Sequence, residues 1–429
     1  GNMRAFVFHD VLKRWLTESG FKVKHVTNIT DVDDKTIGRS REEGVPLKKV
    51  TERYTEAFFE DLRTLNILPA DVYPRATETI PEMVALIKKL MDKKIAYRGK
   101  DGSVYYSIAK FPRYGRLSKI KADELKKGAS GSVISDEYSR EDARDFALWK
   151  AWDKDDGDVF WQTELGKGRP GWHIECSAMS MKNLGETFDI HVGGEDNKFP
   201  HHENEIAQSE GATGRPFVNY WLHIAFLMVD GKKMSKSLGN FYTLRDVLAK
   251  GYDSRAIRWL LFSAHYRDPL NFTFKALDAA GKTVDNLLDF MERLREVQAK
   301  GKHNEALSAA VKRVLEDWKE AMDNDLNVPE ALKAMFLLET EANKALDKGE
   351  LDNHNKKEVL EAMEGFDKVL GVLERKLIDV PDEVKVLAEE REKARKKKDF
   401  KKADELRKEI SKKGWVVEDK PDGYRLRKE

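Results

Sequence analysis

The stretch of sequence that decides the fold is Lys233-Met234-Ser235-Lys236-Ser237, which runs on into Leu238-Gly239-Asn240. Its two ammonium groups stand three residues apart on a short loop with small hydroxyl side chains, so both can reach one phosphate chain. The positive charge they carry matches the negative charge that develops on a pyrophosphate leaving group. An exposed lysine-rich turn is the ordinary alternative, and the sequence around this loop argues against it.

The first thirty residues contain half of a βαβ unit. Apolar residues at helical spacing predict an amphipathic helix over 6–19 that ends at Gly20, and residues 22–26 alternate like a strand. The polar residues 27–31 follow, where the carboxyl end of a strand presents ligands. The opening strand of the unit would lie before Gly1. We therefore expect the strands near 23–26 and 188–192 to face one another across an unfilled space.

The alternation of strands and helices returns after an insertion. Residues 73–166 are polar and lack the regular pattern, and Asp101-Gly102 within them is a hairpin signal. Beyond Gly171 the sequence predicts strands over 188–192 and 220–224, with a helix over 201–209 between them. The pattern predicts two half-sheets that flank an inserted region.

The last third of the chain is mostly helical in period. Residues 276–377 show helical spacing throughout, with a helix start at Asn327-Val328-Pro329-Glu330. A further helix ends at Gly414, and Pro421-Asp422-Gly423 predicts a hairpin after it. From Val384 onward there are 17 Lys and Arg against 11 Asp and Glu. This local excess favours a polyanionic partner, while a solvated charged helix remains the alternative.

Cys176, His201 and Glu205 form a second group of reactive residues. His201 and Glu205 are four residues apart, so a helix would place both on one face. Imidazole, thiolate and carboxylate together suit Zn²⁺. Taken alone, a single cysteine is more often a buried small hydrophobe, and a His/Glu pair at this spacing is more often surface.

Several stretches of this chain closely resemble cysteinyl-tRNA synthetases, which belong to the class I aminoacyl-tRNA synthetases. Lys233–Ser237 is similar to the signature loop of that class, and Gly1-Asn2 matches the second half of its other signature. In the family, the residues matching Cys176, His201 and Glu205 bind zinc, together with a fourth ligand, a cysteine upstream of the first signature. Further similar stretches occur in the family's order, at 28–35, 145–150, 168–179, 199–205 and 322–325.

The resemblance implies a role for each candidate site residue. Lys233 and Lys236 would be catalytic, and Thr30, Trp172 and His191 would contact the substrate cysteine. The implied tRNA contacts are Lys396, Lys397, Lys398 and Arg425. The implied ATP-binding residues are Gly1, Asn2, Gly193, Gly194, Asp196, Lys233, Met234, Ser235, Lys236 and Ser237. Asp196 capping the next turn, and Trp172 packing in the core, are the structural alternatives.

Two departures from the family's pattern fall near these residues. Val192 stands where the family usually has glycine, and Ile224-Ala225 replace a more usual Asn-Gly. Each is expected to reshape the adenine or ribose pocket slightly, because neither removes a charged group.

The implied reaction is ATP-dependent activation of L-cysteine to cysteinyl-adenylate and its transfer to the 3′ end of tRNA-Cys. Serine differs from cysteine by one atom, and a steric pocket separates such pairs by only about 1–3 kcal/mol. A thiolate bound directly to Zn²⁺ separates them, because the metal lowers the thiol pKa and prefers sulfur to a neutral hydroxyl. Zn²⁺ is therefore the expected cofactor, with Mg²⁺ accompanying ATP.

The expected fold is α/β. It comprises a Rossmann-type class I catalytic domain without its first strand, an inserted connective domain, an α-helical bundle and a small α+β C-terminal domain. The expected boundaries are 1–72 and 167–228 for the incomplete catalytic domain, 73–166 for the insertion, 229–275 for the signature loop and stem contacts, 276–378 for the bundle on the anticodon side of tRNA, and 379–429 for anticodon recognition.

The sequence argues against a protein with a membrane-spanning helix and against one stabilised by internal disulfides. No apolar run approaches the roughly 18 residues of a membrane span, and the single cysteine forms no internal disulfide. We expect a cytoplasmic monomer whose partners are tRNA-Cys, ATP and L-cysteine. Two alternatives stay open: a cysteine ligase acting on a small amino-sugar acceptor, against which the basic tail argues, and a tRNA-binding fragment that activates nothing.

Overall fold

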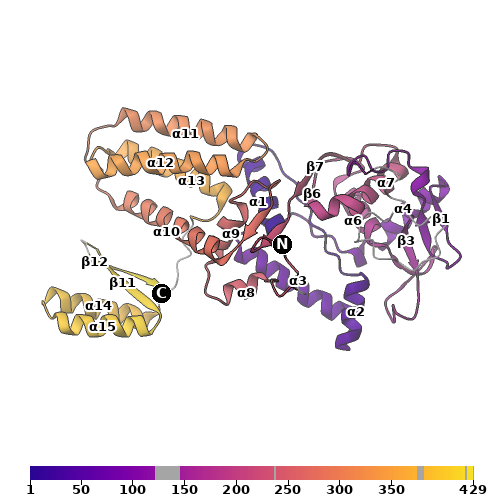
Figure 1. Cartoon of the computed structure of the whole chain (residues 1–429), viewed down its shortest axis with the longest axis horizontal. Helices are drawn as coiled ribbons and strands as arrows, with labels where there is room; N and C mark the ends of the chain where they lie inside the picture. Colours follow the sequence, from indigo (N-terminus) through magenta and orange to yellow (C-terminus); the bar gives the residue numbers. More distant parts are fainter. Residues whose placement is uncertain (121–144, 236–237, 374–380, 421–422, 429) are drawn as a thin grey trace. The chain divides into compact units, whose positions relative to one another are not determined.

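The computed structural model divides the chain into two units, Gly1–Leu373 and Glu374–Glu429 (Figure 1). It describes residues 1–120, 145–235, 238–373, 381–420 and 423–428. None of the described helices is both long enough and apolar enough to cross a membrane.

A parallel pair of strands lies at the centre of the first unit. β6 (Phe188–Gly194) pairs with β7 (Val218–Ile224), from Phe188 opposite Val218 to Gly194 opposite Ile224. Parallel strands need a crossover, and α7 (Glu203–Thr213) supplies it. Helix α6 (Trp172–Leu184) leads into β6. The predicted βαβ unit is therefore present, with its strands and helix close to the expected positions.

The N-terminal helix and the segment after it differ from the prediction in detail. α1 runs from Asn2 to Glu18 and buries Val7, Phe8 and Val11 in the largest hydrophobic cluster. The expected strand over 22–26 is not formed. Only Val26 makes a bridge, to Val72, because the segment 25–29 runs beside 71–76 through a few backbone hydrogen bonds. Within the described residues β6 pairs with β7 alone, so the two predicted strands do not pair directly.

The inserted region is an antiparallel five-stranded sheet with a helical cover. Its strand order is β1-β2-β3-β5-β4, and the Asp101-Gly102 turn joins β1 to β2 as predicted. Helix α4 contacts both α6 and α7, which attaches the insertion to the parallel pair. Its elements are α4 (Ile80–Asp92), β1 (Ala96–Arg98), β2 (Val104–Tyr106), β3 (Phe146–Ala151), β4 (Trp161–Thr163) and β5 (Gly166–Pro170). Helices α2 (Asp34–Glu43) and α3 (Leu47–Thr64) precede the insertion in the chain.

A small mixed sheet and a helical bundle complete the first unit. β8 (Leu227–Val229) lies between β10 (Leu270–Phe272) and β9 (Lys232–Lys233). The bundle lies at one end of the unit in Figure 1, and the insertion lies at the other. Within the bundle, the predicted helix start at Asn327 is confirmed, because the Asn327 side chain caps α12 by accepting the Glu330 N–H. The helices are α8 (Leu244–Leu248), α9 (Ser254–Phe262), α10 (Phe274–Glu296), α11 (Glu305–Asp323), α12 (Val328–Lys348) and α13 (Asn353–Leu370).

The second unit is a small α+β structure with its own core. α14 (Asp382–Lys396) and α15 (Phe400–Lys412) pack on a hairpin of β11 (Trp415–Lys420) and β12 (Gly423–Lys428). Val384, Ile410 and Trp415 are buried between them. The predicted hairpin is present, although residues 421 and 422 of its turn lie outside the described residues.

Candidate active site and metal centre

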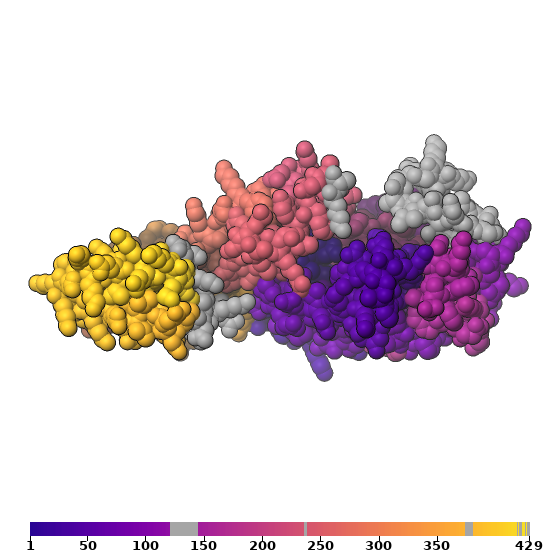
Figure 2. All heavy atoms as spheres, turned by 90° about the horizontal axis from the view of Figure 1, so that it is seen from below, coloured from indigo at the N-terminus to yellow at the C-terminus, as the bar shows by residue number. Residues whose placement is uncertain are grey.

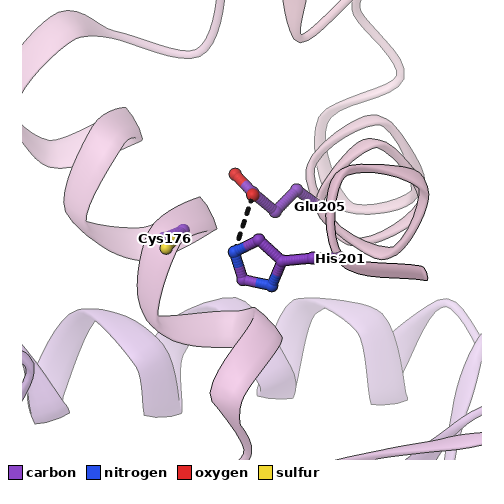
Figure 3. Close-up of side chains that lie close together, drawn as sticks. All are labelled: Cys176, His201 and Glu205. Carbon is purple, nitrogen blue, oxygen red and sulfur yellow. Dashed lines mark ion pairs between the residues drawn. The ribbon is translucent and has the colours of Figure 1, made fainter. Parts of the chain in front are cut away.

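Three side chains, from α6, α7 and the short helical segment just before α7, converge beside the parallel strands. Cys176 lies on α6, His201 lies in the short helical segment Lys198–His202, and Glu205 lies in the first turn of α7. One ligand atom from each lies within 4.8 Å of the others (Figure 3). The spacing of four residues brings His201 Nε2 to 3.1 Å from Glu205 Oε1. The group predicted from the sequence is therefore assembled in the fold.

Burial sets the protonation of this group. Glu205 is fully buried and His201 is 6% exposed. Loss of hydration raises the pKa of the Cys176 thiol well above its usual value, and the nearby Glu205 and Glu175 carboxyls add to the effect. Burial lowers the pKa of His201 to about 3, so its imidazole is neutral, which is the form that binds a metal.

The donor set fits a zinc ion. Two ligands of one tetrahedral zinc ion lie roughly 3.3–3.8 Å apart, given bonds of about 2.0–2.3 Å. The ligand atoms lie within 4.8 Å of one another and the His201–Glu205 pair at 3.1 Å, so only small shifts are needed. Buried Glu205 Oε1 has no hydrogen bond of good geometry, and its near neighbour is His201 Nε2 at 3.1 Å. A cation bound to both atoms would satisfy them. Three protein ligands also leave a position for a further ligand, as in catalytic zinc sites.

A shell of histidines surrounds this group, and sequence reasoning named only part of it. His191 Nε2 lies 2.9 Å from Glu205 Oε2, and these two residues with His202 form a second grouping that could hold a cation. His202 Nδ1 lies 2.9 Å from His223 Nε2. His223 was missed because it lies on β7 and reaches the site through the register that sets it beside Gly193. The separation of His223 from His191 and His202 in the sequence gives no indication that they meet.

The two predicted substrate contacts other than His191 lie in different surroundings. Trp172 is 46% exposed and stacks on His201, with 4.1 Å between ring centroids and 21° between planes. It therefore forms part of the site's wall and does not pack in the core. Thr30 is half-buried in the loop after Val26, where its hydroxyl lies 3.4 Å from the side-chain amide of Asn28.

The two glycines at the end of β6 are closely packed, and the contact at Gly193 is the stricter one, because the His202 ring is buried. A Cβ on Gly193 would lie 2.6 Å from the His202 ring, and one on Gly194 would lie 2.4 Å from Asp196 Oδ1. Asp196 is exposed, and its side chain caps neither of the short helical turns that it borders. Gly1 and Asn2 stand at the start of α1, where Gly1 is the N-cap residue.

The signature loop begins on a hairpin strand. Lys233 is exposed on β9, and Met234 and Ser235 follow it half-buried. Lys236 and Ser237 lie outside the described residues. Figure 2 shows the face of the first unit hollowed between indigo residues from the beginning of the chain and salmon residues from its middle.

The predicted tRNA contacts lie in the second unit. Lys396, Lys397 and Lys398 are exposed at the turn between α14 and α15, and Lys398 has a positive φ of 62°. The backbone of Arg425 lies on β12, while its side chain is outside the described part of the chain.

The fold has solved counterparts. The structure "Mycobacterium tuberculosis methionyl-tRNA synthetase in complex with methionyl-adenylate" superposes with a TM-score of 0.62 at 16% identity, over 87% of this chain and 86% of that one. A family model described as the tRNA synthetases class I (C) catalytic domain matches residues 1–282. The protein is thus a class I aminoacyl-tRNA synthetase with a Rossmann-type catalytic domain.

Curated relatives narrow this class further. The cysteine–tRNA ligase of Protochlamydia amoebophila is 46% identical over 432 residues, and that of Chlamydia caviae is 47% identical over 431. Each alignment covers all of this chain and 90% of the relative. A DALR domain model matches residues 317–374, and a cysteinyl-tRNA ligase anticodon binding domain matches 378–427. The chain belongs to the cysteine–tRNA ligase family of aminoacyl-tRNA ligases.

Proposed function

We propose that this chain activates L-cysteine with Mg²⁺-bound ATP and transfers it to the 3′ end of tRNA-Cys in the cytoplasm. The observation that carries the proposal is the buried group of Cys176, His201 and Glu205. It lies beside the end of β6, where ligands of parallel sheets bind. Membership of the family supports the same reaction.

In this proposal Cys176 Sγ, His201 Nε2 and Glu205 Oε1 hold a zinc ion. Bound there, zinc supplies a Lewis-acid position that takes the thiolate of cysteine and rejects the hydroxyl of serine. The protein's part is to keep His201 neutral and to hold its Nε2 beside Glu205 Oε1. The stacked Trp172 ring forms the wall against which the substrate's backbone would rest.

The nucleotide would lie along the end of β6. Gly193 and Gly194 allow the backbone to approach it closely, and the free Asp196 carboxylate accepts hydrogen bonds from the ribose. Lys233 directs positive charge to the phosphates from β9, with Lys236 proposed to act beside it. Little covalent help is needed, because attack of a carboxylate on phosphorus depends on positioning and charge.

The second unit would bind the tRNA. Its exposed lysines at the α14–α15 turn suit contacts to phosphates, which bind largely through charge. The match to an anticodon binding domain supports a tRNA-binding role for this unit.

Pyrophosphate exchange tests the proposal. We expect exchange that depends on cysteine, ignores serine and needs no tRNA, followed by transfer of cysteine to tRNA. A chelator should abolish exchange, and added Zn²⁺ should restore it. Transfer to a small amino-sugar acceptor in place of tRNA would instead identify the alternative ligase. Absence of cysteine-dependent exchange in the zinc-loaded protein would refute the proposal.

A further inference from the structure

One side chain closes the signature loop across its base. Asn240 Oδ1 accepts the backbone N–H of Ser235 at 2.9 Å, and Asn240 Nδ2 donates to the backbone carbonyl of Lys233 at 3.1 Å. Its amide therefore contacts the chain on both sides of Met234. Asparagine suits this position because it presents one acceptor and two donors at the end of a short, stiff side chain.

Both ends of the loop are held independently of Asn240. Lys233 pairs with Met228 across the β8–β9 hairpin, whose turn residues Asp230 and Gly231 have positive φ values of 49° and 73°. Asn271 Oδ1 fixes that turn by accepting the Gly231 N–H at 2.8 Å. Beyond the loop, Thr243 and Asp246 form a capping box at the start of α8.

The chain reverses direction just before Asn240. Gly239 has a φ of 65°, a left-handed conformation that other residues rarely adopt. This turn brings Asn240 back toward Lys233. The turn at Gly239 and the two Asn240 hydrogen bonds together determine the direction of the backbone from Lys233 to Ser235.

From this geometry we infer that Asn240 is a positioning residue for Lys233. It acts through the backbone from which that lysine reaches the phosphates of ATP. The inference rests on the proposed function. Lysine carries its charge on a flexible four-carbon stem, so the direction of its backbone decides where the ammonium group is concentrated. Water can satisfy the two backbone groups if Asn240 is lost, because the loop lies at the surface. Its removal should therefore affect catalysis more than stability.

The test compares Asn240→Ala with the matched control Asn271→Ala. Both remove an asparagine hydrogen bond to the same hairpin, but only Asn240 bonds the signature loop. We expect Asn240→Ala to lower kcat of cysteine-dependent pyrophosphate exchange about tenfold to a hundredfold, as misplacement of a positioned group does. KM for cysteine, the affinity for tRNA and Tm should not change, and Asn271→Ala should keep the original kcat.

Asn240→Asp tests the two bonds separately. Its carboxylate keeps an acceptor for the Ser235 N–H and loses the donor to Lys233, so kcat should fall to a value between those of the original chain and Asn240→Ala. Equal losses of kcat in Asn240→Ala and Asn271→Ala would overturn the inference, because the effect would then belong to the hairpin in general.

Amide hydrogen exchange at Ser235 distinguishes failure of the Asn240 inference from failure of the proposed function. The Ser235 amide should exchange faster in Asn240→Ala than in the original chain, and at an unchanged rate in Asn271→Ala. An unchanged Ser235 rate in Asn240→Ala would overturn the inference whatever the activity. Absence of cysteine-dependent pyrophosphate exchange in the unsubstituted, zinc-loaded chain would overturn the proposed function instead.

Discussion

The candidate metal centre and the α14–α15 turn place reactive groups in opposite environments. Glu205 is fully buried and borders a neutral imidazole, whereas Lys396–Lys398 are exposed at a turn. A buried group interacts strongly with its neighbours and tolerates little change, because water cannot replace a lost partner. Exposed charges are screened by salt and act nearly independently. The two regions should therefore respond very differently to substitution, pH and salt.

The largest expected effect comes from Glu205→Gln. This change keeps the shape of the side chain but replaces the anionic carboxylate by a neutral amide, so the proposed zinc site would lose its one negatively charged oxygen ligand. We expect kcat/KM for cysteine activation to fall on the order of a hundredfold or more, with bound zinc reduced. Exchange assays and metal analysis measure both. The exposed Glu195, changed to Gln, is the matched control and should behave like the original chain. Full zinc content and activity in Glu205→Gln would remove Glu205 from the site.

The second prediction is that acid lowers the stability of the two units to different extents. Burial lowers the pKa of His9 to about 3 and that of His202 well below its usual value, against about 6.5 in an unfolded chain. Below pH 6.5 the unfolded chain takes up these protons and the folded chain does not, so stability is present above this pH and is lost as pH falls. Two such groups reduce the free energy of unfolding by roughly 2.7 kcal/mol per pH unit.

All ten histidines lie before residue 374, so only the first unit should show this loss. Pulse proteolysis between pH 7 and 5, with fragments of each unit followed separately, measures it. His354→Gln is a suitable control, because that side chain is exposed and should leave the dependence on pH unchanged. Parallel loss of stability in both units would contradict the comparison.

The smallest of these effects is expected at the exposed lysines. Replacing Lys396, Lys397 and Lys398 with alanine should weaken tRNA binding about tenfold and reduce its dependence on salt, because each lost phosphate contact removes roughly 0.7–0.9 from the slope. Cysteine-dependent exchange should be unaffected. Binding measured at several salt concentrations, beside exchange without tRNA, gives both results. A fall in adenylate formation with unchanged tRNA affinity would show that this turn serves the active site.

Local patterns in the sequence correctly predicted many of the helices and their ends. The amphipathic spacing over 6–19 became α1, and Asn327 caps α12 as predicted. His201 and Glu205 come together because a helix sets residues four apart on one face. The prediction was wrong at 22–26, where alternation suggested a strand. A strand exists only if a partner lies along it, and the nearest segment, 71–76, contacts only the end of this stretch.

The sequence by itself determined the class of protein, the order of its helices and the chemistry of its candidate ligands, because each depends on neighbouring residues or short motifs. Only the tertiary structure decided which distant groups meet. It brought Cys176 to His201 across two helices, and His223 to His202 through the register of β6 and β7. It also turned Asn240 back onto Lys233. These contacts join residues through packing, register and chain reversal, which no local spacing records.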